Sequence, residues 1–539
     1  MRGSRIASLA ILGGVVVGGL VVQAADQSSP DGSAPVDVVG TPLPAAAAAG
    51  SLSSTWYCAG GSATEGGVAD HVLLIANASS TDRTAVVTVL AGGFAPPAVI
   101  SEDASGVSST TAPTTTAAPA SSTTTEAPEP VEPRVLKLPA HSRVELALAD
   151  LVDAPLASAI VEVDGGQVAV EHQVTGLDDG RATAPCSTTA SQSWSFPWGV
   201  TARGSRELLV FMNPFPDDAS LDISFATDEG TREPLRFRNF VVPGRSVVGA
   251  YIDDAGGAQR KEQVSAQVNV RSGRLVIDRI QIFGGDDDDD REGITLGLGA
   301  PTAAEMWIFP DGNVAEGVRE QLVVFNPSDD VAEVEVEIRL DDPSTNGAPE
   351  PYELTVLPNR FAIVDLPDPL AGPDDPPRVP LGVGHSFIVR SLNGVAITAE
   401  RVLIASQGSN LGVGSALGSP IAAGTWYFAG GGVIAGERDE TLTLFNASND
   451  EIVTFSVEVL AEGERLPLAD LQDREIPPGG RIAIRLAEHT DRDSLALVVR
   501  ANSPIVAERG IYRVNGRGIS QSIGIPLAAD IVVPDPING

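Results

Sequence analysis

An aromatic segment recurs four times along this chain, at intervals of roughly 105 to 140 residues. Each of these heads is built around one tryptophan: Trp56, Trp194, Trp307 and Trp426. Roughly twenty residues later, each copy has an apolar run that ends in asparagine: Asn77, Asn213, Asn326 and Asn446. A period this long indicates an array of whole domains, because the units of solenoid proteins are shorter. We therefore expect four similar domains.

The apolar residues within each copy alternate with the period of β-strands. In the fourth copy, segments 441–445 and 453–459 alternate as half-buried strands do, and three further short apolar runs follow. Gly, Pro and Asn turns separate these runs, and no segment keeps a helical period for long. The sequence predicts an all-β fold, a tandem array of four immunoglobulin-like antiparallel β-sandwich domains of about seven strands each.

Composition and the repeat set the expected boundaries. A flexible Ser/Pro/Ala linker at 26–50 follows a hydrophobic segment at 1–25. The first copy contains a Ser/Thr/Pro-rich stretch at 101–133, which we expect to be a disordered insertion, either O-glycosylated or unmodified. The four copies are expected at 51–190, 191–301, 302–420 and 421–539.

The N-terminus carries Arg2 and Arg5 before an apolar run from Ile6 to Val22. This pattern is typical either of a cleaved signal peptide or of a retained membrane anchor. Under both interpretations the rest of the chain is exported, and it is secreted or held on the outer side of the cell membrane.

The net charge of −36 argues against nucleic acid or anionic lipid as the main partner of the exported part. The chain has two cysteines, Cys58 in the first head and Cys186 just before the second. Because they bracket one domain of an exported protein, we predict that they form a disulfide.

The last run of the chain, 527–534, resembles the run that leads into the third head, so four copies carry five head-like strands. Three arrangements fit this count. Each head can border the preceding domain, adjacent domains can share a sheet edge, or the chain can close like a propeller with overlapping ends.

A late strand of each copy carries an acidic residue followed by a basic one. The pairs are Glu171-His172, Asp278-Arg279, Glu400-Arg401 and Glu508-Arg509. Neighbours on a strand point to opposite faces, so the two cannot pair with each other, and each arginine needs a carboxylate or carbonyl partner from another strand. We expect these arginines to be structural anchors buried inside their own copies; a ligand-binding role is the alternative.

The heads, the asparagine turns and the late strands together resemble a known family. The fourth copy reads Gly424-Thr425-Trp426-Tyr427-Phe428-Ala429-Gly430, then Phe445-Asn446-Ala447-Ser448, then Pro504-Ile505-Val506-Ala507-Glu508-Arg509. From about residue 54 to its end, the chain is similar to the tandem β-sandwich repeats of exported actinobacterial proteins, the family named Domain of Unknown Function 5719. The resemblance implies architecture and location, and it implies no activity.

Other recurring residues have structural explanations as well. An asparagine at a strand end bonds its own backbone two residues on and fixes the turn, with metal or sugar ligation as the alternative. One tryptophan per copy is more typical of core or interface packing than of a sugar platform.

The sequence carries no motif for catalysis or for a cofactor. The five histidines, His71, His141, His172, His385 and His489, are not spaced as metal ligands. The run Asp286–Asp290 lacks the alternating ligands of a calcium loop, and we interpret it as a solvated surface loop, with calcium binding as the alternative.

We therefore expect a non-enzymatic structural or interaction protein of the cell envelope, which acts as a spacer or adhesion scaffold and contacts an envelope protein or glycan. One alternative is a cell-wall carbohydrate-binding protein, which would need exposed aromatic side chains. The second is a glycosidase-like enzyme or its accessory subunit, which would need two facing carboxylates in a cleft.

Overall fold

The computed structural model describes residues 43–96, 131–176, 180–284, 291–341, 348–368, 377–407, 410–514 and 516–534. The predicted signal or anchor segment, most of the linker, nearly all of the insertion and the run Asp286–Asp290 lie outside these residues. Within them, no helix is both long and apolar enough to cross a membrane. The only helical segments there are 3₁₀ turns of three residues.

The first copy contains β1 (Ser54–Cys58), β2 (Ala69–Asn77), β3 (Arg83–Phe94), β4 (Arg134–Leu138), β5 (Ser142–Ala147), η1 (Leu148–Asp150), β6 (Leu156–Val163), β7 (Val168–Gly176) and β8 (Arg181–Pro185). The second contains β9 (Ser193–Phe196), β10 (Ser205–Asn213), β11 (Ala219–Thr227), β12 (Gly230–Arg232), η2 (Leu235–Phe237), β13 (Phe240–Val242), β14 (Ser246–Tyr251), β15 (Val264–Ser272), β16 (Val276–Gly284) and β17 (Glu292–Leu298).

The third copy contains β18 (Met306–Asn313), β19 (Val318–Asn326), β20 (Ala332–Leu340), β21 (Tyr352–Val356), β22 (Arg360–Leu366), β23 (Gly384–Ser391), β24 (Thr398–Ala405) and β25 (Asn410–Leu417). The fourth contains β26 (Ala422–Phe428), β27 (Arg438–Phe445), β28 (Val453–Ala461), β29 (Glu464–Pro467), η3 (Ala469–Leu471), β30 (Arg474–Ile476), β31 (Arg481–Arg485), η4 (Leu486–Glu488), β32 (Leu497–Arg513), β33 (Gly516–Arg517), β34 (Ile519–Ile523), β35 (Ile525–Pro526), η5 (Ala528–Asp530) and β36 (Ile531–Val532).

Each copy is a sandwich of two antiparallel sheets, which confirms the predicted fold class. One sheet holds the head strand, in the order β1-β6-β3-β4 in the first copy, and we call it the head sheet. The other, the inner sheet, has the order β5-β2-β7-β8. The third copy repeats both orders as β18-β23-β20-β21 and β22-β19-β24-β25. These copies have eight strands rather than the predicted seven, because the strand after the asparagine turn forms a hairpin with one more edge strand.

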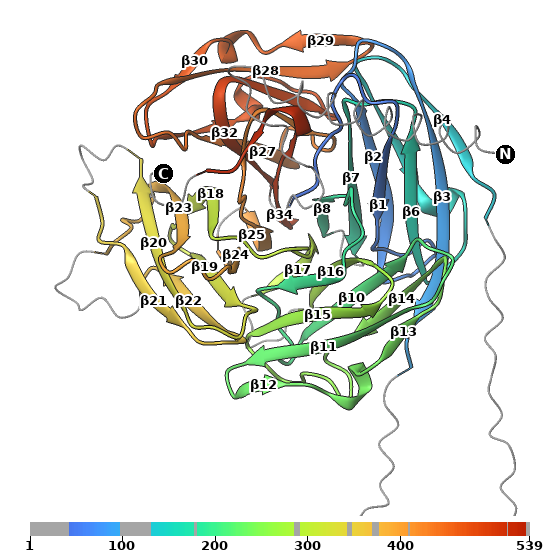
Figure 1. Cartoon of the computed structure of the whole chain (residues 1–539). Coiled ribbons are helices and arrows are strands. Elements are labelled where there is room, and N and C mark those ends of the chain that lie inside the picture. The colour runs from blue at the N-terminus through green and yellow to red at the C-terminus, as the bar shows by residue number, and fades with distance from the viewer. Residues whose placement is uncertain are drawn as a thin grey trace, which may run out of the picture. The chain divides into compact units, whose positions relative to one another are not determined.

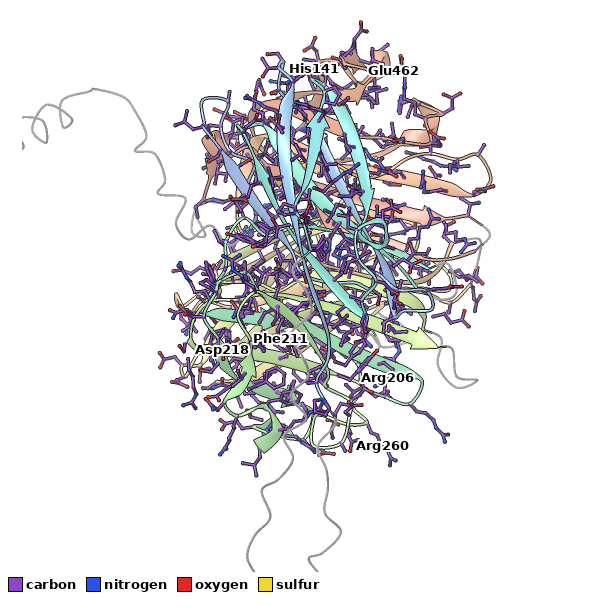
Figure 2. The ribbon with its side chains drawn as sticks, turned by 90° about the vertical axis from the view of Figure 1, so that its right-hand side faces the viewer. His141, Arg206, Phe211, Asp218, Arg260 and Glu462 are labelled. Carbon is purple, nitrogen blue, oxygen red and sulfur yellow. A yellow bond between two sulfur atoms is a disulfide. The ribbon has the colours of Figure 1, made fainter. Side chains whose placement is uncertain are left out.

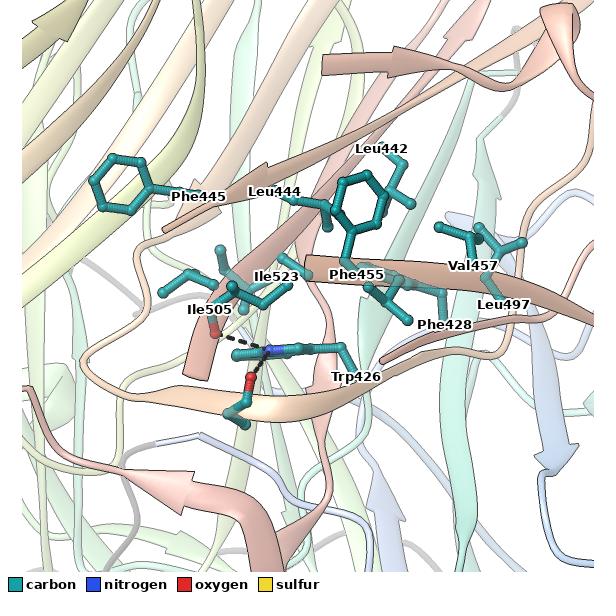
Figure 3. Close-up of a cluster of buried hydrophobic side chains, with 14 of the residues drawn as sticks. Trp426, Phe428, Leu442, Leu444, Phe445, Phe455, Val457, Leu497, Ile505 and Ile523 are labelled. Carbon is teal, nitrogen blue, oxygen red and sulfur yellow. Dashed lines mark hydrogen bonds between the residues drawn. The ribbon is translucent and has the colours of Figure 1, made fainter. Parts of the chain in front are cut away.

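Side-chain alternation explains why these segments are strands. In β20 every second residue from Ala332 to Leu340 is buried, and the residues between them are Glu or Arg that remain partly exposed. A strand with this pattern covers a core with one face and keeps the other in water. In the fourth copy, Phe455 and Val457 of β28 pack with Trp426 and Phe428 of the head strand between the two sheets (Figure 3).

The last strands of the four inner sheets meet in a closed cycle. β8 contacts β17, β17 contacts β25, β25 contacts β34, and β34 contacts β8 again. Figure 1 shows these strands gathered between the four sandwiches. The copies therefore do not form an open row.

The two ends of the described chain pair with each other and close this arrangement. Ala46 donates its N–H to Pro526 and accepts one from Ala528, and β36 pairs with the start of β26. The overlap of ends that the sequence left as one of three alternatives is thus present. The first and fourth copies also touch at the tip of the β28–β29 turn, where Arg465 donates to Nδ1 of His141 at 3.2 Å. His141 and Glu462 lie together there in Figure 2.

The head strands of the first three copies pair with the segment that leaves their own copy, which differs from the alternative in which a head borders the preceding domain. Tyr57 pairs with Ser187, Ser195 with Ala300, and Ile308 with Ser419. In addition, β3 of the first copy continues alongside β14 of the second as a short parallel pair. This β3–β14 pair ties the first two copies together through their backbones, and it is a case of the shared sheet edge that the sequence left open.

Candidate functional site

The four head tryptophans are fully buried. Three of them donate the indole N–H to a backbone carbonyl: Trp194 to Leu275 at 3.0 Å, Trp307 to Ile397 at 2.8 Å, and Trp426 to Ile505 at 2.9 Å. A buried indole of this kind fills a core and fixes a turn, and a sugar cannot reach the face of its ring.

The four asparagines hold the turns that follow their strands. In each copy the side-chain oxygen accepts the backbone N–H two residues on, from Ser79, Phe215, Ser328 and Ser448, at 3.0 to 3.1 Å. Each side-chain nitrogen donates to a carbonyl of the strand or turn that returns beside it, such as Val356 at 2.9 Å for Asn326. This is the local backbone bonding that the sequence predicts.

The late-strand arginines leave their own sandwich and pair with the glutamate of the next copy. Arg279 of the second copy holds Glu400 of the third with both terminal nitrogens, one of them at 3.0 Å from Oε2. Arg401 of the third copy pairs with Glu508 of the fourth. The expectation that each guanidinium is buried inside its own copy is therefore wrong. Each arginine lies on the core-facing side of its sheet but near the centre of the molecule, where the next copy presents its carboxylate.

The fourth copy is joined in the same way to the first. Arg509 Nη2 lies 3.1 Å from both carboxylate oxygens of Glu171, and Gly430 donates its N–H to that carboxylate at 2.6 Å. These two side chains are 338 positions apart in sequence. The same link that joins neighbouring copies thus also closes the chain on itself.

The remaining link joins the first copy to the second and has a different chemistry. His172 stands where the other copies have arginine, and its Nε2 lies 3.5 Å from Oδ2 of Asp278. Ala59 donates its N–H to the same oxygen at 3.1 Å. The two departures from the Glu-Arg pattern therefore meet at one interface, where both side chains are shorter.

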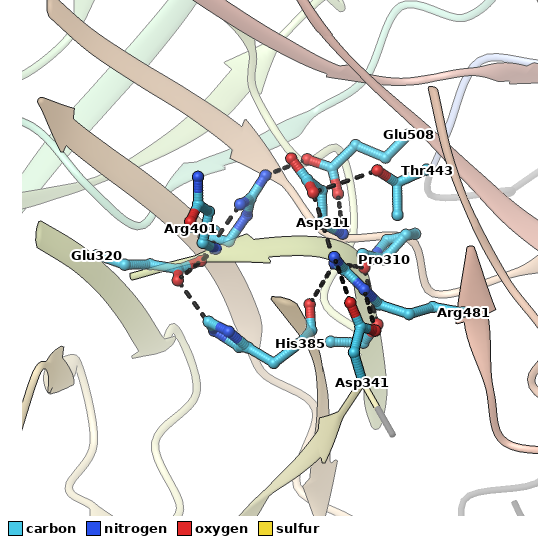
Figure 4. Close-up of polar contacts among 11 residues, drawn as sticks. Pro310, Asp311, Glu320, Asp341, His385, Arg401, Thr443, Arg481 and Glu508 are labelled. Carbon is cyan, nitrogen blue, oxygen red and sulfur yellow. Dashed lines mark hydrogen bonds and ion pairs between the residues drawn. The ribbon is translucent and has the colours of Figure 1, made fainter. Parts of the chain in front are cut away.

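A second position, on the strand that ends at the asparagine, contributes a further buried polar side chain to each link. It is occupied by His71, Glu207, Glu320 and Glu440, each six residues before the asparagine of its copy. Glu320 pairs with its own copy's Arg401 at 3.2 Å and with His385 at 2.9 Å (Figure 4). Sequence reasoning missed these residues, although the constant spacing to the asparagine is a signal that marks them.

These four links form a continuous cycle of buried polar groups around the last strands, which we call the polar ring. It comprises Glu171, His172, Asp278, Arg279, Glu400, Arg401, Glu508 and Arg509, with His71, Glu207, Glu320 and Glu440 behind them. The third–fourth interface extends it with Arg481, which donates to the carbonyls of Pro310 and His385 and pairs with Asp341 (Figure 4).

Burial shifts the ionisation of the ring in both directions. It raises the pKa of Asp278 to about 7 and lowers the pKa of His71 to about 4. The pKa of Glu207 is raised well above its usual range for the same reason, and among the described residues neither of its oxygens has a hydrogen-bond partner. Burial opposes the charge on Arg401, but Glu508 and Glu320 outweigh that effect and raise its pKa. Burial also raises the pKa of Glu508 to about 7 and raises the pKa of Glu440, although Arg401 and Arg509 oppose these shifts.

The two cysteines form the predicted disulfide between Cys58 in the first head strand and Cys186 after β8. It ties the head sheet of the first copy to the segment that leads into the second. Among the residues that the structure describes, no cluster of three or more His, Cys, Asp or Glu side chains is arranged to hold a metal ion.

Comparison with known proteins gives little to add to this geometry. No curated protein matches the chain. One solved structure, described as the crystal structure of Thermotoga maritima 1070, is 18% identical. It aligns over 21% of this chain and 94% of its own, with a TM-score of 0.18, too low to support an argument about fold or function. Residues 165–277 match the model of a family described as "Family of unknown function (DUF5719)", which confirms the family that the repeated motifs indicate.

Proposed function

We propose that this chain is a non-enzymatic structural and interaction protein of the cell envelope, exported and held at or released from the outer side of the membrane. In this role its four sandwiches act together as a spacer or adhesion scaffold that contacts an envelope protein or glycan. One observation carries the proposal: the side chains that recur in every copy bond to the scaffold itself, inside a copy or between copies.

The energetics of the links suit such a role. Four interfaces, each with buried polar pairs and apolar packing, make relative motion of the copies costly, because opening an interface breaks its polar pairs and exposes its apolar surface to water. The overlap of the chain's ends removes the free terminal domains at which an open array begins to fray. A body that keeps its shape under load is what a spacer requires.

The two alternatives lose the features on which they depend. Carbohydrate recognition through the head tryptophans needs exposed indole rings, and all four are buried. A glycosidase needs facing carboxylates that a substrate can reach, but the recurring carboxylates are buried in the polar ring. Neither the head tryptophans nor the polar ring favours either alternative over the scaffold.

The proposal is tested by locating and replacing the protein in its own cells. A reporter enzyme active only outside the cytoplasm, fused after Gly539, should be active. Replacing residues 43–534 with an unrelated, stable β-sandwich array of similar length should restore a loss-of-function phenotype if the role is spacing. Adhesion predicts export without this rescue. An inactive reporter, or turnover of glycoside substrates by the purified full-length chain, would contradict the proposal.

A further inference from the structure

A groove of about 1010 Å³ lies between the first and fourth copies. One wall is the inner sheet of the first copy, with residues of β2, β5, β7 and β8. The other wall is formed by the connection between β26 and β27, the segment before β32, and the far end of β32. The groove adjoins the Arg509–Glu171 link, because a Cβ on Gly430 would lie 3.2 Å from Glu171 and 2.4 Å from the groove residue Leu74.

The corresponding face is apolar and filled in the second and third copies. At the positions of Gln173 and Thr175 in β7, the second copy has Ile280 and Ile282 and the third has Val402 and Ile404, as the strand registers show. Ile280 packs against the first copy, and Val402 and Ile404 pack against the second.

The neighbouring strand shows the same contrast. Arg181 and Thr183 of β8 occupy the positions of Ile294 and Leu296 in β17. Ile294 and Leu296 both contribute to the packing between the first and second copies. At Gln173, Thr175 and Arg181 the first copy therefore carries polar side chains where the second and third copies have apolar ones, whereas the position of Thr183 is Leu296 in the second copy and Ser415 in the third. A sealed interface gains nothing from such groups, whereas a binding groove requires them.

The walls of the groove hold four arginines in a chain of strongly negative net charge: Arg143, Arg181, Arg438 and Arg513. Arg143 is largely buried, pairs with Glu145 and donates to the carbonyls of Gly431 and Leu495. Its Nε is buried and has no hydrogen-bond partner among the described residues. Arg438 is part-buried and donates to the carbonyls of Gly432 and Asp493. Arg143 is thus held by one carboxylate and two carbonyls, and Arg438 donates to two neutral carbonyls.

The lining of the groove holds four arginines against five carboxylates, Glu65, Asp70, Glu145, Glu437 and Asp493, so its charges nearly balance in a chain whose net charge is −36. Burial lowers the pKa of Arg143 to about 10; Glu171 opposes that shift, and Arg509 and Arg438 add to it. Burial also lowers the pKa of Arg438, Glu440 opposes this, and the nearby charge of Arg181 lowers it further. The carboxylates of the groove, such as Glu65, Asp70 and Glu437, are solvent-exposed. They lie where water screens them and where they can accept bonds from hydroxyl groups.

We propose that this groove binds a small polyhydroxylated anion, with a carboxylate or phosphate group between Arg143, Arg181 and Arg438 and its hydroxyl groups facing Gln173, Thr175 and the exposed carboxylates. Guanidinium groups recognise both oxyanions through paired N–H donors. This inference does not depend on the scaffold role. A spacer does not need a binding groove, and the groove could bind its ligand whether or not the protein acts as a spacer.

The test is calorimetric titration of the full-length chain at low salt with four probes: galacturonate, glucose 6-phosphate, inorganic phosphate and neutral galactose. Galacturonate or glucose 6-phosphate should bind, with galactose weaker by at least about tenfold, as expected for loss of one charge-assisted contact. The first two probes distinguish a sugar acid from a sugar phosphate. Inorganic phosphate measures what the anion contributes without the hydroxyl groups.

Matched variants locate the site. Arg181→Gln removes an exposed groove arginine and should weaken the anionic sugar by at least about tenfold. Glu437→Gln removes a groove carboxylate and should tighten binding severalfold at low salt. Arg134→Gln makes the same charge change on β4, an exposed edge strand of the head sheet, and should leave the affinity unchanged. Three results would each overturn the inference: no binding of either anionic sugar, equal binding of galactose, or equal losses in the Arg181 and Arg134 variants.

Discussion

Replacing Arg279 with methionine removes the basic half of the link between the second and third copies. It leaves Glu400 buried, and in the described part of the chain the remaining donor to its carboxylate is the backbone N–H of Trp198, 3.2 Å from Oε2. At the 3.0 Å separation of Arg279 Nη1 and Glu400 Oε2, a dielectric constant of about 20 gives roughly 5.5 kcal/mol of attraction. Removing one partner of a buried pair costs about 3–5 kcal/mol, because the other charge stays without compensation. We therefore expect Arg279→Met to lower the free energy of unfolding by about that amount.

The double variant Arg279→Met/Glu400→Leu separates charge from packing. Both charges are then gone, and the two new side chains lie beside Trp198 and other apolar groups. Replacing a whole buried pair by apolar residues is often neutral or stabilising, so this protein should recover most of the loss. Urea unfolding of the full-length chain, followed by tryptophan fluorescence with the disulfide intact, measures the cycle of four proteins.

An exposed pair supplies the control. Arg271 and Asp222 form an ion pair on the surface of the second copy, and Arg271→Gln should cost less than about 1 kcal/mol. The reasoning is refuted if Arg279→Met costs no more than this control, or if the double variant is as unstable as the single one. Either result would mean that the link contributes no more than a surface contact does.

Three further predictions concern other parts of the scaffold. Reducing the Cys58–Cys186 bond, or replacing both cysteines with serine, should cost about 5 kcal/mol in the chain-entropy model for a separation of 128, and reductant should then have no added effect on the urea midpoint. Asn326→Ala should cost about 1–3 kcal/mol in the same assay, because three backbone groups lose a buried partner; a protein as stable as the parent would contradict the turn assignment. His71 has a folded pKa of about 4, below its unfolded value, so its contribution is complete above about pH 6.5 and is lost as the pH falls toward 4. The His71→Gln variant should therefore lose less stability than the parent when the pH falls from 7 to 4. The raised pKa of Asp278 has the opposite effect on stability, but it is present in both proteins and so largely drops out of the difference between them.

The strands and the repeated turns could be predicted from sequence because their determinants are local. The alternation in β20 and the bond from Asn326 to the N–H two residues on involve neighbours along the chain. Strand geometry also shows that Glu400 and Arg401 cannot pair with each other. The identity of their partners could not be predicted, because Arg401 and Glu508 are 107 positions apart and meet only once two sandwiches are docked.

One long-range contact did leave a trace in the sequence. The first copy has His172 in place of arginine, and the second has Asp278 in place of glutamate. Considered separately, each of these two substitutions is a departure from the Glu-Arg pattern of the repeat. In the structure they are partners, so the two departures compensate each other at a single interface.

The third member of that link, His71, follows from the same physics. In the other copies this position is glutamate, beside an arginine of the same copy: Glu320 lies 3.2 Å from Arg401. Without an arginine in the first copy, a glutamate at position 71 would be a buried acid with no strong base near it. A histidine can instead be buried in its neutral form, and here its Nε2 lies 2.9 Å from Nδ1 of His172 while its Nδ1 bonds the carbonyl of Ala157 at 2.8 Å. With histidine instead of arginine at position 172, the acid at position 71 is replaced by histidine and the acid at position 278 is aspartate instead of glutamate. His71, His172 and Asp278 therefore form a single unit of the ring.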